Sequence, residues 1–131
     1  KRLQQEFGMA IMFITHDLGV IANMADDVVV MYRGKVAEFG TVRQVLKNPK
    51  HPYTKALLRS IPNFSRNKHR LESIEGTVGM PLDPPDECPF TNRCNVVMSE
   101  CYEAMPGMTQ FDDGHCVACY HYNTIKESEI K

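Results

Sequence analysis

The fold prediction depends on one stretch, Met9-Ala10-Ile11-Met12-Phe13-Ile14-Thr15-His16-Asp17-Leu18. An unbroken apolar run over 9–14 stops at a polar triplet, and a segment with helical spacing follows. Such a run favours a strand buried on both faces, as in a parallel sheet. Ligands bind at the carboxyl ends of strands in open α/β sheets, so the pattern places His16 where an imidazole can contact a phosphate or transfer a proton. Taken by itself, this histidine is more simply explained as a hydrogen-bonded residue at a strand end.

Helices are predicted on both sides of this run. Residues 1–8 are typical of a helix end closed by Gly8, which indicates a piece of a longer protein. After the strand, Thr15 or Asp17 can cap a helix through its side-chain oxygen. The packing stripe of that helix follows the i, i+3, i+4, i+7 spacing and consists of Leu18, Ile21, Ala22 and Ala25.

A hairpin is predicted next, with short apolar strands over 28–31 and 36–39. The residues between them, 32–35, have turn chemistry, because Gly34 can adopt a positive φ. The second strand is expected to end at Gly40 and Thr41.

Two short helices are then predicted. Thr41 and Gln44 have the spacing of a capping box, for a helix that ends at Asn48-Pro49. His51-Pro52-Tyr53 opens the next helix, with Pro52 in the first turn, where its missing N–H does no harm. The packing face of this helix is expected to consist of Ala56, Leu57, Ser60 and Ile61, with Pro62 ending it.

The bulk composition excludes several classes of protein. The chain has 131 residues, of which 43% are hydrophobic and 24% charged, with a net charge of -1. This is ordinary for a globular domain and gives no electrostatic reason to expect a nucleic-acid partner. No apolar run approaches the roughly 20 residues of a membrane span, so direct membrane insertion is not expected.

Composition changes after residue 62. Residues 63–70 are polar and basic and are typical of a linker, 71–79 have room for a short strand, and the prolines in 83–87 exclude regular structure. We therefore expect two parts, an α/β part over 1–62 and a loop-rich, cysteine-rich module over 63–131.

All five cysteines lie in the second part, with the spacing Cys88-x5-Cys94-x6-Cys101-x14-Cys116-x2-Cys119. An odd number of cysteines without a secretory signal favours metal binding over disulfides. Four thiolates are the usual ligands of a structural zinc ion or a 4Fe–4S cluster. Only the last pair has zinc-like spacing, which slightly favours the larger cluster. Buried, unliganded thiols are the simpler alternative.

Two histidines, His115 and His121, flank the last cysteine pair. Either can act as a metal ligand. A surface or hydrogen-bonded role is the more common one for each.

Three segments together resemble one family. The segment 13–28 resembles the switch-histidine region of ABC-transporter ATPase domains, which have a P-loop NTPase-like fold, and 30–38 resembles the strand pair that follows it there. The segment 48–58, which contains His-Pro-Tyr, resembles the C-terminal region of the oligopeptide/dipeptide importer branch. The cysteine pattern over 88–119 is similar to the tail of the same branch.

The resemblance implies a function for a larger parent subunit, which would couple ATP hydrolysis to dipeptide or oligopeptide uptake. His16 would be the switch histidine, which contacts the γ-phosphate of ATP. The ligands of a 4Fe–4S cluster would be Cys88, Cys94, Cys101 and Cys119, with Cys116 as an extra thiol. ATP and Mg²⁺ would be cofactors of the parent only. Its partners would be membrane-spanning permease subunits and a second ATP-binding subunit, at the cytoplasmic face of the cell membrane.

Several parts of that family do not occur in this sequence. There is no G-x-x-x-x-G-K-[ST] phosphate loop and no Leu-Ser-Gly-Gly-Gln segment. The chain is therefore expected to be a C-terminal fragment that does not hydrolyse ATP by itself. Its unpaired sheet edge favours self-association. A stand-alone zinc-binding interaction module is the alternative, which explains the cysteines but not the His16 segment.

Overall fold

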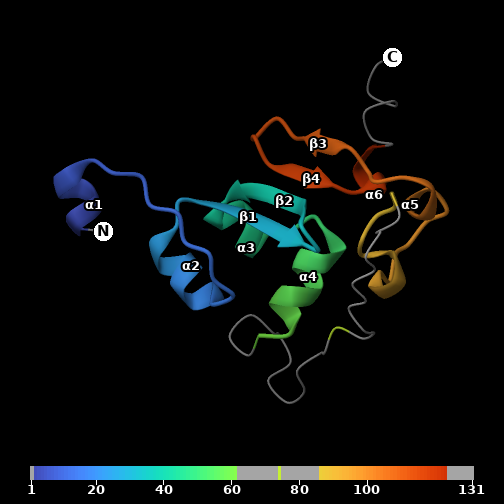
Figure 1. Ribbon diagram of the computed structural model, residues 1–131, viewed down its shortest axis with the longest axis horizontal. Coiled ribbons are helices and arrows are strands. Elements are labelled where there is room, and N and C mark those ends of the chain that lie inside the picture. Colours follow the sequence, from blue (N-terminus) through green and yellow to red (C-terminus); the bar gives the residue numbers. More distant parts are fainter. Residues whose placement is uncertain (1, 62–73, 75–85, 124–131) are drawn as a thin grey trace.

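The sheet at the centre of the fold has four strands, all paired antiparallel. The structure, a computed structural model, describes residues 2–61, 74 and 86–123. In spatial order, the strands are β1 (Asp27–Tyr32), β2 (Lys35–Thr41), β4 (Cys116–Ala118) and β3 (Met108–Gln110). Figure 1 shows β3 and β4 beside the β1–β2 hairpin. The predicted α/β class is therefore confirmed in its broad form, with an antiparallel sheet.

The β1–β2 hairpin confirms the local prediction. Arg33 and Gly34 both have positive φ, 49° and 77°, as a type I′ turn requires. β2 includes Gly40 and ends at Thr41, so it extends two residues beyond the predicted strand over 36–39. In β1, exposed and less exposed positions alternate, so only one face of this strand is buried.

Two helices lie against this hairpin. α3 (Val42–Lys47) packs on β1 and β2, and α4 (Pro52–Arg59) packs on β2. The predicted capping box of α3 is present, since the Thr41 hydroxyl accepts from Gln44 N and the Gln44 side chain accepts from Thr41 N. His51 caps α4, with Pro52 in the first turn as expected.

A small apolar core joins these helices to the preceding one. α2 (Leu18–Met24) begins after Asp17, whose carboxylate accepts hydrogen bonds from two backbone amides. Leu18, Leu46 and Leu58 form the buried cluster that connects α2, α3 and α4. The predicted stripe was correct for Leu18 and Ile21, whereas Ala22 is exposed.

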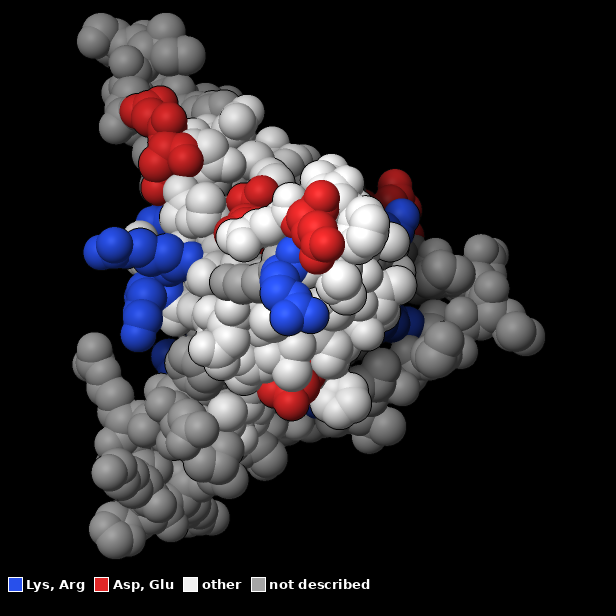
Figure 2. Space-filling model, turned by 90° about the vertical axis from the view of Figure 1, so that its left-hand side faces the viewer, with Lys and Arg blue, Asp and Glu red and all other residues white. Residues whose placement is uncertain are grey.

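The prediction of a buried parallel strand over 9–14 was wrong. This segment has no strand, and Ile14 is 92% exposed. It follows α1 (Arg2–Phe7), which ends at Gly8 with a φ of 61°, as predicted. A strand needs neighbours for its backbone hydrogen bonds, and within the described residues no strand lies beside this run. Figure 2 views the molecule from this end, and most of the described surface there is uncharged.

The C-terminal part is loop-rich, as expected. Its other elements are η1 (Thr91–Arg93), α5 (Glu100–Glu103) and α6 (Tyr120–Asn123). β4 pairs with β2, so one sheet includes strands from both predicted parts. The predicted linker over 63–70 lies outside the described residues, as does the possible strand over 71–79 apart from Ile74. The division at residue 62 stays a prediction. In the described part of the chain, no helix has the length and apolarity that a membrane crossing requires.

Candidate functional site

Four cysteines line one hollow in the C-terminal part of the structure. They are Cys88, Cys94, Cys101 and Cys119, the set that the family resemblance implied. Cys116 is not among the residues that line this hollow, and its thiol donates instead to Gly114 O at 3.4 Å. We call this space the thiol hollow.

The cysteines reach the hollow from short, tightly turned segments. Cys88 N donates to Cys101 O at 2.9 Å, which joins the first segment to α5. The Thr91 hydroxyl donates to Cys88 O at 3.0 Å, and Cys94 N donates to Thr91 O at 3.2 Å. Cys119 follows directly after β4, so the sheet determines where this thiol lies. The four cysteines thus reach the hollow from three stretches of chain.

Burial favours the protonated form of three of these thiols when no metal is bound. Burial, with a smaller contribution from the neighbouring cysteines, raises the pKa of Cys119 to about 11. Burial also raises the pKa of Cys88 and of Cys94. A metal ion or cluster bound there would reverse this effect, because a positive centre favours the thiolate.

The four cysteines of the hollow are a donor set of the kind that both structural zinc ions and iron–sulfur clusters use. Four soft thiols around one hollow are the ligands that such clusters use. In the described residues, however, no group of three or more His, Cys, Asp or Glu side chains is arranged to hold one metal ion. A zinc ion needs four ligand atoms at about 2.0–2.3 Å from one point. A cluster is a larger body, so its ligands lie further apart.

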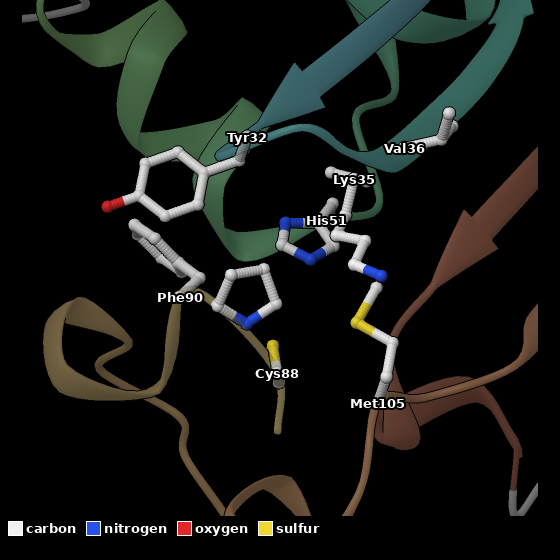
Figure 3. A pocket seen from close by; sticks show the side chains of 9 residues that line it. Tyr32, Lys35, Val36, His51, Cys88, Phe90 and Met105 are labelled. Atoms are coloured by element: carbon white, nitrogen blue, oxygen red, sulfur yellow. The ribbon is translucent and has the colours of Figure 1, made fainter. Parts of the chain in front are cut away.

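His51 lines both the thiol hollow and a second, smaller pocket. Figure 3 shows its ring and the Cys88 thiol directed into that second pocket, with Tyr32 and Phe90 on one side and Met105 on the other. The ring is 4% exposed, and its Nδ1 accepts a hydrogen bond from Tyr53 N at 3.0 Å. Burial lowers the pKa of His51 to about 4, against a smaller opposing effect of Glu38.

Aromatic rings attach the cysteine segment to the hairpin and to α4. Phe90 lies 5.3 Å from Tyr32 and 5.4 Å from Tyr53 between ring centroids, and Tyr32 lies 4.6 Å from Tyr53. The same cluster includes Cys88 and Cys101. The thiol hollow is therefore packed directly against the His-Pro-Tyr segment.

A buried carboxylate lies beside this site, on β2. Glu38 is fully buried and accepts hydrogen bonds from Lys50 N at 2.7 Å and His51 N at 3.0 Å. Its Oε1 also lies 2.7 Å from His115 Nε2, and the His115 ring is fully buried. The sequence analysis did not identify Glu38, since its partners are distant in sequence.

The two histidines beside the last cysteine pair are both hydrogen-bonded, as the simpler interpretation predicted. His115 pairs with Glu38, and His121 Nε2 lies 2.8 Å from Val96 O. His121 also lines the thiol hollow, whereas His115 does not.

His16 lies apart from the thiol hollow. It is exposed, in the short segment before α2, and it is not among the residues that line the hollow. On either side of it, the Thr15 hydroxyl accepts from Asp17 N at 3.0 Å, and Asp17 Oδ1 accepts from Gly19 N at 2.8 Å. Figure 1 shows the N-terminal segment at the opposite end of the molecule from α5 and α6.

Comparison with known proteins shows what this chain is similar to. Residues 37–101 match the family described as the oligopeptide/dipeptide transporter, C-terminal region. The matched residues include Glu38, the His-Pro-Tyr segment and the first three cysteines of the thiol hollow.

Three transport proteins extend the similarity over nearly the whole chain. The dipeptide transport ATP-binding protein DppF of Haemophilus influenzae is 43% identical over 91% of the chain and 37% of its own length. DppD of Bacillus subtilis, also a dipeptide transport ATP-binding protein, is 44% identical over 92% of the chain and 36% of its length. The oligopeptide transport ATP-binding protein OppF of Salmonella typhimurium is 39% identical over 91% of the chain and 36% of its own length. The chain thus spans about 37% of the length of these transport proteins.

Proposed function

We propose that this chain is the C-terminal part of the ATP-binding subunit of a peptide-class ABC importer. The observation that carries this proposal is the similarity of over 90% of the chain to ATP-binding proteins of dipeptide and oligopeptide transport. The whole subunit would bind ATP and Mg²⁺ and couple hydrolysis to uptake of dipeptides or oligopeptides. It would act with membrane-spanning permease subunits and a second ATP-binding subunit, peripherally at the cytoplasmic face of the membrane.

His16 is the proposed switch histidine of this subunit. It is exposed beside the capped start of α2, where its imidazole is accessible to a phosphate of bound nucleotide. Phosphoryl transfer is accelerated mostly by positioning and by stabilisation of charge, which one well-placed imidazole can assist. The phosphate loop and the Mg²⁺ ligands belong to parts of the subunit outside these residues, so the 131 residues alone are proposed to be inactive.

The ATPase proposal is tested with His16→Ala in the intact subunit, assembled with its partners. ATP turnover should fall by about 100-fold, which is typical for loss of one group that stabilises charge in the transition state. Nucleotide affinity should change little. Lys47→Ala, at an exposed position of α3, is the control and should retain turnover. Unchanged turnover in His16→Ala would refute the role.

The thiol hollow is the proposed site of a 4Fe–4S cluster held by Cys88, Cys94, Cys101 and Cys119. Its support is the shared hollow together with the soft donor set. Such a cluster supplies a cross-link among three segments of the chain and is capable of one-electron transfer. Anaerobic purification followed by iron and acid-labile sulfide analysis tests this. Four irons per chain are expected, with the content lost in Cys94→Ser and kept in Cys116→Ser. Stoichiometric zinc without iron would favour the alternative zinc module instead.

The proposed division into parts at residues 1–62 and 63–131 has a separate test. Limited proteolysis of the intact protein should cut first between 63 and 70, where composition indicates a linker. First cuts elsewhere would contradict the division.

A further inference from the structure

We infer that Glu38 and His115 are positioning residues whose buried pair sets the register of β4 on β2 and so places Cys119 in the thiol hollow. Two experiments test this inference, and only the second, which measures metal content, rests on the proposed cluster. The inference starts from the 2.7 Å contact between the Glu38 carboxylate and the His115 ring, two fully buried groups 77 positions apart in the sequence.

The ladder between β2 and β4 is too short to fix its own register. It has two residue pairs, Glu38 with Val117 and Phe39 with Cys116. A slip by one residue would turn every side chain of β4 to the opposite face. In the observed register, Val117 is fully buried and Cys116 is partly exposed. A slip would therefore exchange the environments of these two residues.

The Glu38 carboxylate distinguishes the correct register from a slipped one. Three donors converge on it, namely the ring of His115 and the backbone amides of Lys50 and His51. A slip moves His115 by about 3.3 Å along the strand, out of hydrogen-bond reach. The slipped state then leaves a buried charge without one of its partners, which is strongly unfavourable. Specifying register is a well-attested use of buried polar pairs.

The backbone of β2 provides the space that His115 needs. A Cβ added at Gly40 would lie 3.1 Å from His115 Cδ2 and 2.9 Å from Gln44 Oε1. Gln44 Nε2 also donates to Asp113 O at 2.9 Å, at the tip of the β3–β4 hairpin. The tip is thus held by contacts on β2 and α3 that only this register satisfies.

The position of Cys119 follows from this register. It lies two residues after Val117, and β4 leads directly to it. Neither Glu38 nor His115 lines the hollow, although Glu38 accepts a hydrogen bond from the backbone of His51, which does. The effect of the pair on Cys119 is transmitted through β4, which leads directly to that residue.

The first test is thiol labelling of the intact, metal-free protein, with each cysteine followed by mass spectrometry. Glu38→Gln keeps the shape of the side chain but removes the charge that binds three donors. Labelling of Cys119 should accelerate by about 100-fold, because breaking a buried pair shifts such an equilibrium by that order. Labelling of Cys116 should slow. Glu103→Gln, the same change at an exposed position, is the control and should leave both rates unchanged.

The labelling results separate a register effect from general destabilisation. Parallel acceleration at Cys88, Cys101, Cys116 and Cys119 would mean that the variant simply unfolds, and it would overturn the inference. Unchanged rates at Cys119 would overturn it as well. Gly40→Ala is the milder second variant, since it displaces the His115 ring without removing a charge. It should accelerate Cys119 labelling in the same direction, and no change there would count against the inference.

The second readout is the metal content of anaerobically purified protein. Glu38→Gln should contain less iron than the unsubstituted protein, although no thiol has been removed. If the unsubstituted protein contains no iron, the proposed cluster is wrong, but the labelling test of register is unaffected. If both proteins contain iron equally and Cys119 labelling is unchanged, the inference fails and the cluster stands.

Discussion

Replacing Phe90 by alanine should destabilise the protein more than any exposed substitution in the chain. Phe90 is 2% exposed and packs against Tyr32 and Tyr53. Removal of a buried Phe side chain costs about 3–5 kcal/mol, through lost burial and the cavity that remains. The total stability of a domain is about 5–15 kcal/mol, so this one change removes a large part of it.

The contribution of the aromatic contacts is separable from that of burial. Phe90→Leu keeps most of the apolar volume and should cost about 1 kcal/mol. A double-mutant cycle of Phe90→Ala with Tyr53→Ala should give a coupling energy of about 0.5–1.5 kcal/mol, since the rings lie 5.4 Å apart. Phe7→Ala is the control, because Phe7 is 65% exposed and should contribute less than about 0.5 kcal/mol.

The measurement is urea denaturation followed by far-UV circular dichroism and tyrosine fluorescence. The chain has no Trp and five Tyr, so the fluorescence reports on the cluster that contains Tyr32 and Tyr53. The midpoint should fall with an unchanged slope, which indicates lost stability without a change in the unfolded state. A loss below about 1 kcal/mol for Phe90→Ala would refute the account of how the cysteine segment is attached.

Three further predictions concern pH, capping and assembly. The pKa of His51 is about 4 when folded and 6.5 when unfolded, so unfolding takes up a proton and stability should fall by about 3 kcal/mol as the pH drops from 6.5 to 4. His51→Asn keeps a capping oxygen and should abolish this loss of stability, as measured by urea denaturation between pH 6.5 and 4. If stability still fell with pH as steeply in His51→Asn, the prediction would be wrong. Thr41→Ala should cost about 1 kcal/mol by the same assay, and no measurable loss would refute the capping role. β1 is an edge strand that exposes Val29 and Met31, which favours self-association. Light scattering should show an average mass that rises with protein concentration, and Val29→Lys should lower this mass. A monomer at every concentration would exclude self-association.

The features predicted correctly from the sequence are those that a few neighbouring residues determine. Gly34 fixes the hairpin turn, Asp17 caps α2, and Thr41 with Gln44 forms the capping box. In each case, the group that stabilises the structure lies within four residues of the group it contacts. Local chemistry is then sufficient for prediction.

The apolar run over 9–14 shows where this reasoning fails. Six consecutive apolar residues indicate burial on both faces, but burial depends on what surrounds the segment. In the described structure, Met12 is 85% and Ile14 92% exposed. The pattern therefore indicated buried surroundings that the described residues do not supply. The sequence of the segment alone cannot distinguish an apolar run that is covered from one that is exposed.

Glu38 was missed for the opposite reason. A single carboxylate in the strand sequence Val36-Ala37-Glu38-Phe39 looks like a solvent-facing position. Its burial depends on His115, 77 residues later, and on the pairing of β2 with β4. The spacing of the cysteines predicted a shared thiol site, but nothing local to them indicated that a charged residue in another strand would lie beside it.

The thiol hollow therefore depends on more than its cysteines. In metal-free protein, burial keeps Cys119 protonated and gives it no strong partner that would fix its position. The position must come from the backbone, and β4 has only two residue pairs with β2 to supply it. A buried polar pair costs free energy that an apolar pair would not, so its presence here is better explained by specificity than by stability. Both members lie on the strands that meet at this ladder or at its end, where one hydrogen bond can decide the register. On this reasoning, a chain that kept all four cysteines but lost Glu38 would assemble the hollow incorrectly.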